Sequence, residues 1–211
     1  MKYLRGLVSW CLCYLMTVTV MASALDAHDV LNRVSEAFRK AGGIEAAFTL
    51  QMGTASQPVK GSICLLGDKF VLDAAGVKTW FDGRTQWSYL LSTEEVNVSL
   101  PTPEELQTLH PFAWLSLFQK GYKMHLERES AKAYYIVLSS MTPHQVLQRI
   151  WIEIDKQTYY PLSVRIQQVG DSQDGILSIK IIDLKTQQDY SDSFFVFDSK
   201  KYPDAEIIDL R

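Results

Sequence analysis

The sequence predicts a mainly β protein, built on one long antiparallel sheet that is strongly curved or closes on itself. Apolar and polar residues alternate through most of the chain, short glycine-containing turns separate the alternating stretches, and helical spacing is confined to a few segments. A long flat sheet would leave its edge strands exposed, so curvature or closure is the expected way to protect them.

The first 24 residues have the features of an export signal. Lys2 and Arg5 precede an apolar stretch over residues 7–21, and Ala22-Ser23-Ala24 offers a small-residue cleavage site. We expect residues 1–24 to be a signal peptide and residues 25–211 to form a single secreted domain. Cleavage leaves 19 of the 21 basic residues against 24 acidic ones, and this net charge of −5 makes nucleic acid a poor partner.

The first segment after the signal is predicted to be an amphipathic helix over residues 27–40. Asp26 is placed to cap its N-terminus, and Gly42-Gly43 ends it. The apolar residues that recur every three or four positions are Val30, Leu31, Val34, Ala37 and Phe38.

Strands with a period of two follow this helix. The first covers residues 44–52, with Phe48 on its apolar face. Asp82-Gly83 predicts a two-residue type I′ turn between two later strands, because that turn needs positive φ angles. The further strands are expected over residues 59–66, 69–73, 77–81, 84–91, 94–100, 122–129, 134–139, 149–155, 162–169, 176–185 and 194–197.

Short helices interrupt the strands after residue 101. Thr102-Pro103-Glu104-Glu105 combines an N-cap, a first-turn proline and a glutamate three residues after the cap, which marks a helix start. Pro111 begins a second helix that runs to Lys120-Gly121 and is apolar on most sides. Since such a helix needs more than one apolar neighbour, we expect it to lie as a lid across the concave face of the sheet.

The sequence contains no recognised catalytic, nucleotide-binding or metal-binding motif. It has no G-x-S-x-G element and no glycine-rich phosphate loop, and Cys64, the only cysteine left after signal cleavage, has no C-x-x-C partner. We therefore expect no enzymatic activity, no metal and no cofactor, and a buried, unreactive thiol at Cys64. The four histidines, which lack metal-ligand spacing, are His28, His110, His125 and His144.

Aromatic and aliphatic side chains are concentrated in the predicted hairpins and the second helix. They are either ordinary core or the lining of a cavity between lid and sheet. Such a cavity suits lipid acyl chains, because hiding ~16 methylenes at about 0.8 kcal/mol each is favourable by roughly 13 kcal/mol. The residues expected to line it are Phe48, Leu50, Phe70, Leu72, Phe81, Trp87, Tyr89, Val96, Val98, Phe112, Trp114, Leu115 and Phe118.

Several short motifs follow one another in a characteristic order, and they are Phe48, Gly61-Ser62-Ile63, Lys69-Phe70, the aromatic hairpin over residues 80–89 and the ending over residues 195–211. In this order the chain resembles the LolA-like family of outer-membrane lipoprotein carriers, in the branch found in Bacteroidetes-type bacteria. The order and spacing of these motifs extend over nearly the whole chain after the signal.

The resemblance implies an incomplete, unclosed β-barrel whose short helices form a lid over a hydrophobic cavity. It implies a monomeric periplasmic carrier without catalysis, which takes the acyl chains of lipoproteins from an inner-membrane ABC transporter and ferries them to the outer membrane. Whether an outer-membrane receptor takes part stays an open question. Whether the lid has a latch is also open, because Leu66-Gly67 stands where family members commonly have an Arg-Pro pair upstream of the cavity phenylalanine, here Phe70.

Two other hypotheses stay open at this point. The chain could be a periplasmic lipid-sensing regulator of an anti-sigma factor, which shares the half-barrel but would have a stable protein partner and usually a second domain. It could also be a hydrolase of envelope lipids, whose available acids would be Asp82, Glu94 and Glu95. We expect these three acids in turns and facing solvent.

Overall fold

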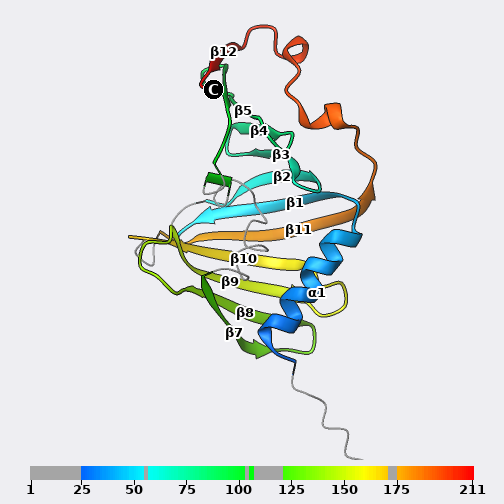
Figure 1. The fold of residues 1–211 in the computed structure, drawn as a ribbon, viewed down its shortest axis with the longest axis vertical. Helices are drawn as coiled ribbons and strands as arrows, with labels where there is room; N and C mark the ends of the chain where they lie inside the picture. The colour runs from blue at the N-terminus through cyan, green and yellow to red at the C-terminus, as the bar shows by residue number, and fades with distance from the viewer. Residues whose placement is uncertain (1–24, 55–56, 103–104, 107–120, 171–174) are drawn as a thin grey trace, which may run out of the picture.

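A single sheet of 12 strands dominates the computed structural model, which describes residues 25–54, 57–102, 105–106, 121–170 and 175–211 (Figure 1). The strands are β1 Gly43–Met52, β2 Val59–Leu66, β3 Lys69–Ala74, β4 Val77–Phe81, β5 Gln86–Leu90, β6 Glu95–Ser99, β7 Tyr122–Glu129, β8 Ala133–Ser140, β9 Leu147–Asp155, β10 Pro161–Gln168, β11 Leu177–Gln188 and β12 Glu206–Asp209. The helical elements with described bounds are the α-helix α1 Ala27–Lys40 and two 3₁₀ helices, η2 Asp192–Phe195 and η3 Ser199–Lys201.

The strand order across the sheet is β12-β6-β5-β4-β3-β2-β1-β11-β10-β9-β8-β7. Neighbouring strands are antiparallel, except that β12 runs parallel to β6. The pairing of β1 with β11 joins two hairpin series into one sheet, and the sheet does not close, because its outermost strands are β7 and β12. The prediction of a mainly β protein with a curved, unclosed antiparallel sheet is confirmed.

Helix α1 has the bounds and the N-cap that the sequence predicts. The Asp26 carboxylate accepts a hydrogen bond of 2.8 Å from the backbone N–H of Asp29, and the chain leaves the helix through Gly42 at φ +65°. Val30 and Val34 are fully buried against the sheet. Figure 1 shows α1 lying across the β7 to β11 side of one face, which we call the inner face.

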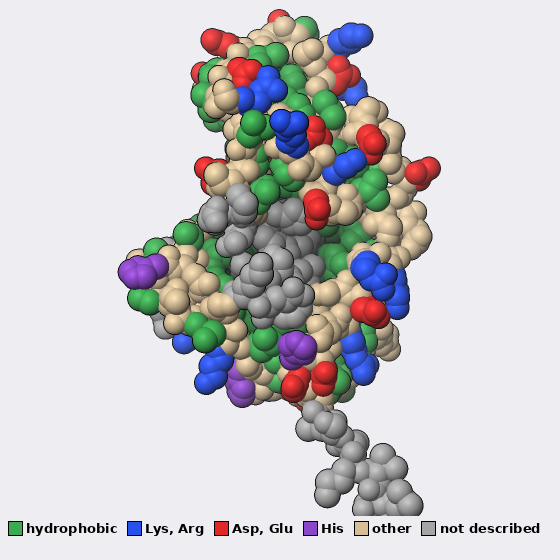
Figure 2. Space-filling view, in the orientation of Figure 1, with side chains coloured by type: hydrophobic (Ala, Val, Ile, Leu, Met, Phe, Trp, Pro, Cys, Tyr) green, Lys and Arg blue, Asp and Glu red, His purple; other side chains and the backbone are tan. Residues whose placement is uncertain are grey.

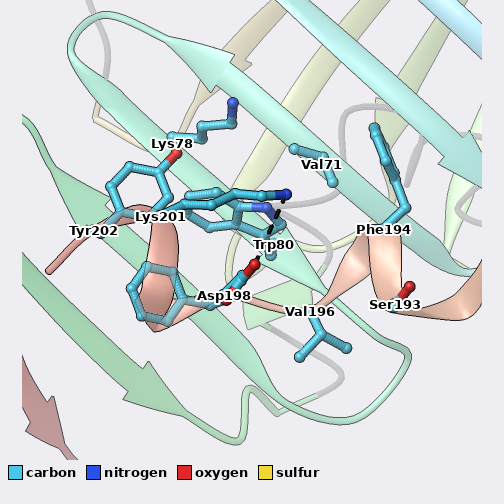
Figure 3. A pocket seen from close by; sticks show the side chains of 10 residues that line it. Val71, Lys78, Trp80, Ser193, Phe194, Val196, Asp198, Lys201 and Tyr202 are labelled. Atoms are coloured by element: carbon cyan, nitrogen blue, oxygen red, sulfur yellow. Dashed lines mark ion pairs between the residues drawn. The ribbon is translucent and has the colours of Figure 1, made fainter.

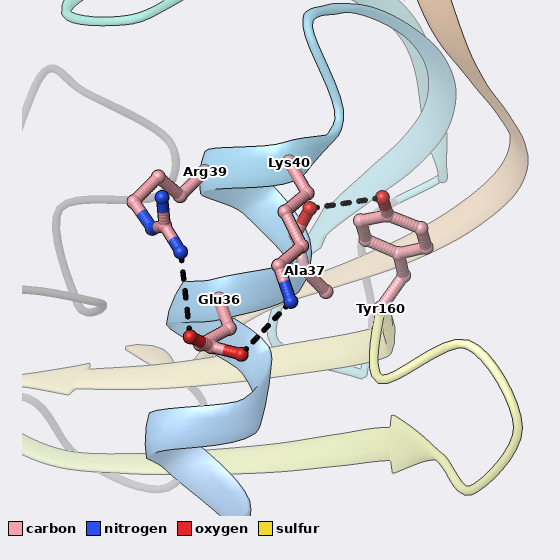
Figure 4. Close-up of polar contacts among 5 residues, drawn as sticks. All are labelled: Glu36, Ala37, Arg39, Lys40 and Tyr160. Carbon is pink, nitrogen blue, oxygen red and sulfur yellow. Dashed lines mark hydrogen bonds and ion pairs between the residues drawn. The ribbon is translucent and has the colours of Figure 1, made fainter.

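The turn between β9 and β10 holds the C-terminal half of α1 in place (Figure 4). The hydroxyl of Tyr160 donates a hydrogen bond of 3.2 Å to the main-chain oxygen of Ala37, and its ring meets Phe38 edge-on at 5.3 Å between centroids. On the exposed side of the same turn of helix, the Glu36 carboxylate forms ion pairs with basic residues, including Lys40 at 3.1 Å. The buried valines and the Tyr160 contacts thus hold the helix on the sheet, whereas the Glu36–Lys40 ion pair lies within the helix itself.

Asp155 shapes that turn. One of its carboxylate oxygens accepts hydrogen bonds from the backbone N–H groups of Gln157 and Thr158, at 2.9 and 2.8 Å. Burial raises the pKa of Asp155, but the hydrogen bonds from Thr158 and Gln157 outweigh that effect and hold the pKa below its ordinary value.

Two apolar clusters lie on opposite faces of the sheet, as the alternation of side chains along a strand requires. Phe70 and Phe81 belong to the large inner cluster, which also contains the buried face of α1. Their neighbours Val71 and Trp80 point to the other side, the outer face. There they pack against the C-terminal segment, which Figure 1 shows running from the end of β11 to β12.

The turn after β4 differs from the predicted type I′ turn. Phe81 pairs directly with Gln86, so the loop has four residues, and within it Gly83 has a positive φ, +99°, whereas Asp82 does not. The Asp82 carboxylate instead accepts hydrogen bonds from the N–H groups of Arg84 and of the residue after it, at 2.9 and 2.7 Å. A local side chain to backbone bond therefore replaces the second left-handed residue.

The strand predicted over residues 194–197 is wrong, and the last strand lies further on. The 3₁₀ helix η2 ends at Phe195, which is fully buried on the outer face, while Phe194 and Val196 are exposed. The alternation in this segment therefore reflects packing against the sheet without strand pairing. Strand β12 instead lies in the expected irregular end, where Ile207 pairs with Val96 of β6.

The predicted helix start after β6 is confirmed. The backbone N–H of Thr102 donates to the Glu105 carboxylate at 2.7 Å, and the N–H of Glu105 donates to the Thr102 hydroxyl at 3.2 Å, which is a reciprocal capping box. The predicted second helix, with Phe112, Trp114, Leu115 and Phe118, lies outside the described residues, as do residues 1–24. Within the described part of the chain, no helix has the length and apolar character to span a membrane.

Candidate functional site

An apolar surface runs across the inner face from β4 to β7. Phe81 and Phe70 are cross-strand partners whose ring centroids lie 5.4 Å apart, and Phe48 faces Ile181 across the β1–β11 pair. The surface continues through aliphatic side chains on the other strands, which are Leu126, Met124, Leu138, Ile136, Ile150, Ile152, Val164, Ile166, Ile179 and Leu50. Apolar side chains of neighbouring strands therefore form one continuous apolar layer, most of which is buried.

The inner face becomes polar at β5. Gln86 is the direct partner of Phe81, and Ser88 is the direct partner of Thr79, so all four side chains point to the same side. The Gln86 amide donates a hydrogen bond of 3.1 Å to the Ser88 hydroxyl, which lies 3.4 Å from the hydroxyl of Thr79. The apolar surface thus ends at a row of hydrogen-bonding groups.

The structure divides the predicted cavity residues between the two faces. On the inner face it brings together Phe48, Leu50, Phe70, Leu72 and Phe81. On the outer face it places Trp87, Tyr89, Val96 and Val98, as the pairs Trp80 with Trp87, Trp87 with Val98 and Tyr89 with Val96 show. These four residues do not share a surface with Phe48. The remaining four, on the predicted second helix, lie outside the described residues.

The parity of the loop lengths explains this division. A loop with an even number of residues makes an odd-numbered position of one strand face the same way as an even-numbered position of the next strand. The loop after β4 and the loop after β5 both have four residues. Phe81 therefore shares its face with Gln86 and with Ser99. This division could have been predicted from the sequence by counting the residues in each loop.

The outer face carries an aromatic cluster of its own. Trp80 meets Phe197 at 5.4 Å and Tyr202 at 5.6 Å between ring centroids, and Tyr202 also meets Tyr89 at 4.8 Å. Trp80 and Tyr202 line a pocket of about 440 Å³, to whose lining Lys78 also belongs (Figure 3). This cluster was not predicted from the sequence, although the aromatic residues near the C-terminus were a signal for it.

The acids considered for a hydrolase lie in turns or at a strand end. Asp82 is engaged by backbone N–H groups of the β4–β5 loop, and Glu94 occupies a turn at φ +56° with its side chain exposed. Glu95, at the start of β6, accepts a hydrogen bond of 3.0 Å from Thr93. Asp82 and Glu94 thus lie in turns as expected, whereas Glu95 lies in a strand, and of the three only Glu94 is exposed.

Cys64 is half-buried on the outer face, beside the C-terminal segment. Burial raises the pKa of its thiol, and a hydrogen bond with Tyr190 lowers it to a smaller extent. Burial also raises the pKa of Tyr190 far above the ordinary range for a phenol. Both groups are therefore neutral at physiological pH, as expected for a thiol with a packing role.

Among the described residues, three potential metal ligands lie close together at the start of α1. Ligand atoms of Asp26, His28 and Asp29 come within 4.8 Å of one another, and all three residues are exposed. The Asp26 carboxylate is engaged as the helix cap.

Figure 2 shows acidic and basic side chains interspersed with hydrophobic ones on the face of the molecule that it presents.

Comparisons with known proteins agree with this architecture. The family model described as outer membrane lipoprotein carrier protein LolA matches residues 17–170, and no curated protein matches the chain. An uncharacterized conserved protein from Thermus thermophilus has a TM-score of 0.60 at 15% identity, with coverage of 87% of this chain and 98% of that one. At this identity the likeness shows the fold alone.

Two further solved structures are less similar. A LolA superfamily protein from Nitrosomonas europaea has a TM-score of 0.45 at 14% identity, covering 82% of this chain and 99% of that one. MucB of Pseudomonas aeruginosa, solved in complex with MucA, has a TM-score of 0.44 at 14% identity, covering 82% and 61%. Because the family model matches well over half of the chain, the protein belongs to the outer membrane lipoprotein carrier protein LolA family.

Proposed function

We propose that the protein binds the acyl chains of lipoproteins on its inner face and carries them across the periplasm, from an inner-membrane ABC transporter to the outer membrane. Membership of the LolA family supports this proposal. The observation that carries it is the continuous apolar inner face of an unclosed sheet. Residues 1–24 would act as the signal peptide for export, and the carrier would need no catalytic group.

The chemistry of the inner face suits a saturated hydrocarbon. Its described side chains are mainly aliphatic, with phenylalanine rings on β1, β3 and β4, and they offer no directional interaction that an acyl chain would have to satisfy. Sheltering a chain of ~16 methylenes would be favourable by roughly 13 kcal/mol, at about 0.8 kcal/mol each. Burial of apolar area is therefore sufficient to hold the ligand.

The open architecture would let the inner face take up and release such a ligand. A closed barrel has hydrogen bonds around its whole circumference, so widening it means breaking strand pairs. Here β7 and β12 form separate edges, and a change of curvature leaves every strand pair intact. The sheet could thus admit chains of different number or length without unfolding.

Two adjacent isoleucines of β11 provide a matched test. Ile181 lies on the inner face opposite Phe48 and is partly buried, whereas Ile182 is 57% exposed. We expect Ile181→Gln to lose most of the bound lipoprotein, because it places an amide on the apolar surface. Ile182→Gln, which makes the same chemical change on the neighbouring residue, should bind normally.

The measurement is native mass spectrometry of the mature protein, purified from the periplasm of cells that co-express a lipoprotein. A stoichiometric lipoprotein complex in the wild type and in Ile182→Gln, but not in Ile181→Gln, would support the carrier. Thermal unfolding of both variants controls for loss of structure. A lipid-free wild-type protein that co-purified with a membrane regulator would contradict the proposal and favour the sensor hypothesis.

A further inference from the structure

The apolar inner face ends at a polar row whose first member on β5 is the buried Gln86. Gln86 begins β5 directly opposite Phe81, and it is only 8% exposed, against 3% for Phe81. Ser99, the partner of Gln86 on β6, continues this polar row. An acyl chain lying along the phenylalanines would therefore bring its end group to Gln86.

The amide of Gln86 is only partly satisfied by the described residues. Its nitrogen donates to the Ser88 hydroxyl at 3.1 Å, while its oxygen is buried without a hydrogen-bond partner among them. Turning the amide around exchanges the two atoms, and one of them then still lacks a partner. Buried polar atoms without partners are rare in folded proteins, so this oxygen points to a ligand group that donates a hydrogen bond to it.

A pocket adjoins Gln86 at this end of the sheet. It measures about 630 Å³, and its wall includes Gln86, Ser99, Thr102, Glu105 and Arg211. Such a volume is large enough for a lipid end group of a few atoms. The pocket thus lies where the apolar surface stops.

The charges around this pocket disfavour an anionic end group. The Arg211 guanidinium is held by the Asp209 carboxylate through two hydrogen bonds, at 2.9 and 2.6 Å. The Thr102 hydroxyl donates to the Glu105 carboxylate at 3.1 Å. Because Arg211, the basic residue in the pocket wall, is already paired with Asp209, it does not offer a free cation to an anionic group, whereas the Gln86 carbonyl offers a neutral acceptor to a donor.

We infer that Gln86 and this pocket form a subsite for an uncharged hydrogen-bond donor at the end of the acyl chain, such as the amide N–H of an N-acylated amine. The inference rests on the proposed function and adds a polar specificity to it. The Gln86 carbonyl accepts the donor's hydrogen, and the pocket holds the atoms that follow it. An ester, which has no donor, lacks this interaction.

Three probes with the same hydrocarbon chain separate the possibilities. N-methylhexadecanamide has one N–H donor, methyl hexadecanoate replaces that N–H by oxygen, and hexadecanol has a hydroxyl donor. Their affinities for the mature protein would be measured by displacement of a fluorescent fatty acid. The variants are Gln86→Met, which keeps the length and flexibility of the side chain, and the control Gln51→Met on β1.

We expect the wild type to bind the amide on the order of tenfold more tightly than the ester, as one hydrogen bond would give. Gln86→Met should abolish that preference and leave the ester affinity unchanged, whereas Gln51→Met should retain the preference. A preference for hexadecanol over the amide would overturn the assignment to an amide. It would show that the donor is a hydroxyl group, such as one of glycerol.

Two further outcomes would overturn the inference, and they differ from failure of the proposed function. Equal binding of amide and ester by the wild type would show that the subsite does not read a donor. An equal loss of both probes in Gln86→Met would give Gln86 a structural role only. If no probe of any kind bound to the wild type, the acyl-chain carrier itself would be contradicted.

Discussion

The ring of Phe48 lies over Gly61, its direct cross-strand partner on β2. A Cβ atom at Gly61 would lie 2.5 Å from Cζ of Phe48 and 2.9 Å from Cβ of Ala74, both too close for real carbon atoms. The missing side chain of this glycine therefore lets the Phe48 ring lie against the sheet backbone. The pair therefore determines how far the Phe48 ring projects from the sheet, on the face where the acyl chain is proposed to bind.

Gly61→Ala should displace the Phe48 ring and destabilise the protein by about 1–3 kcal/mol, because overpacking forces side chains from their preferred positions. Urea unfolding monitored by circular dichroism checks the loss. Ser62→Ala is the control, since Ser62 is the next residue and is exposed. An unchanged unfolding midpoint for Gly61→Ala would show that the ring moves aside without cost.

The C-terminal segment should depend on Phe195 far more than on its neighbour Phe194. Phe195 is fully buried against the outer face, whereas Phe194 is 41% exposed. We expect Phe195→Ala to cost about 3–5 kcal/mol, the usual range for a buried phenylalanine, and Phe194→Ala to cost clearly less. Urea unfolding together with limited proteolysis after residue 189 would compare the two, and equal effects would contradict this packing.

Cys64 should react slowly with iodoacetamide in the folded protein. Burial raises the pKa of its thiol, so the reactive thiolate is scarcer than in the unfolded chain. As pH rises, the Cys64 thiol loses its proton in the unfolded chain before it does so in the folded protein. The stabilisation of the folded state by the protonated thiol is therefore complete below about pH 8.5, the ordinary thiol pKa, and is lost as pH rises through the folded pKa. Alkylation at the rate of a free cysteine would contradict the burial, and Phe195→Ala should accelerate the reaction.

Tyr160→Phe tests the anchor of helix α1. The variant removes the hydrogen bond to Ala37 but keeps the ring against Phe38, and we expect a loss of about 1 kcal/mol. Glu36→Gln removes exposed ion pairs on the same turn of helix, and the melting temperature should barely change. Differential scanning calorimetry measures both, and a larger effect for Glu36→Gln would show that surface charges anchor the helix instead.

Local patterns predicted the elements well wherever one short stretch of sequence contains the cause. The cap at Asp26 and the capping box between Thr102 and Glu105 need only neighbouring residues, and both are present. The turn after Phe81 was harder to predict, because an aspartate at position 82 is compatible with a two-residue loop and with a four-residue loop. Its carboxylate bonds, which are visible only in the structure, select four.

The candidate site was predicted less completely than the fold. Phe48, Phe70 and Phe81 were correctly placed on one face, since strand alternation and hairpin parity are sufficient for that. Trp87 and Tyr89 were assigned to the same face by their aromatic character alone, and parity places them on the other. Composition indicates that a surface is apolar, whereas only register decides which surface it is.

By itself, the sequence determined the helix at residues 27–40, most of the strands and the absence of a recognised catalytic motif, because these depend on spacing within a few residues. The tertiary structure alone decided that β1 pairs with β11, that β12 joins β6 in parallel, and that Phe195 belongs to the outer cluster with Trp80. These contacts join segments far apart in the chain. Their stability comes from area buried between distant residues, for which no local pattern exists.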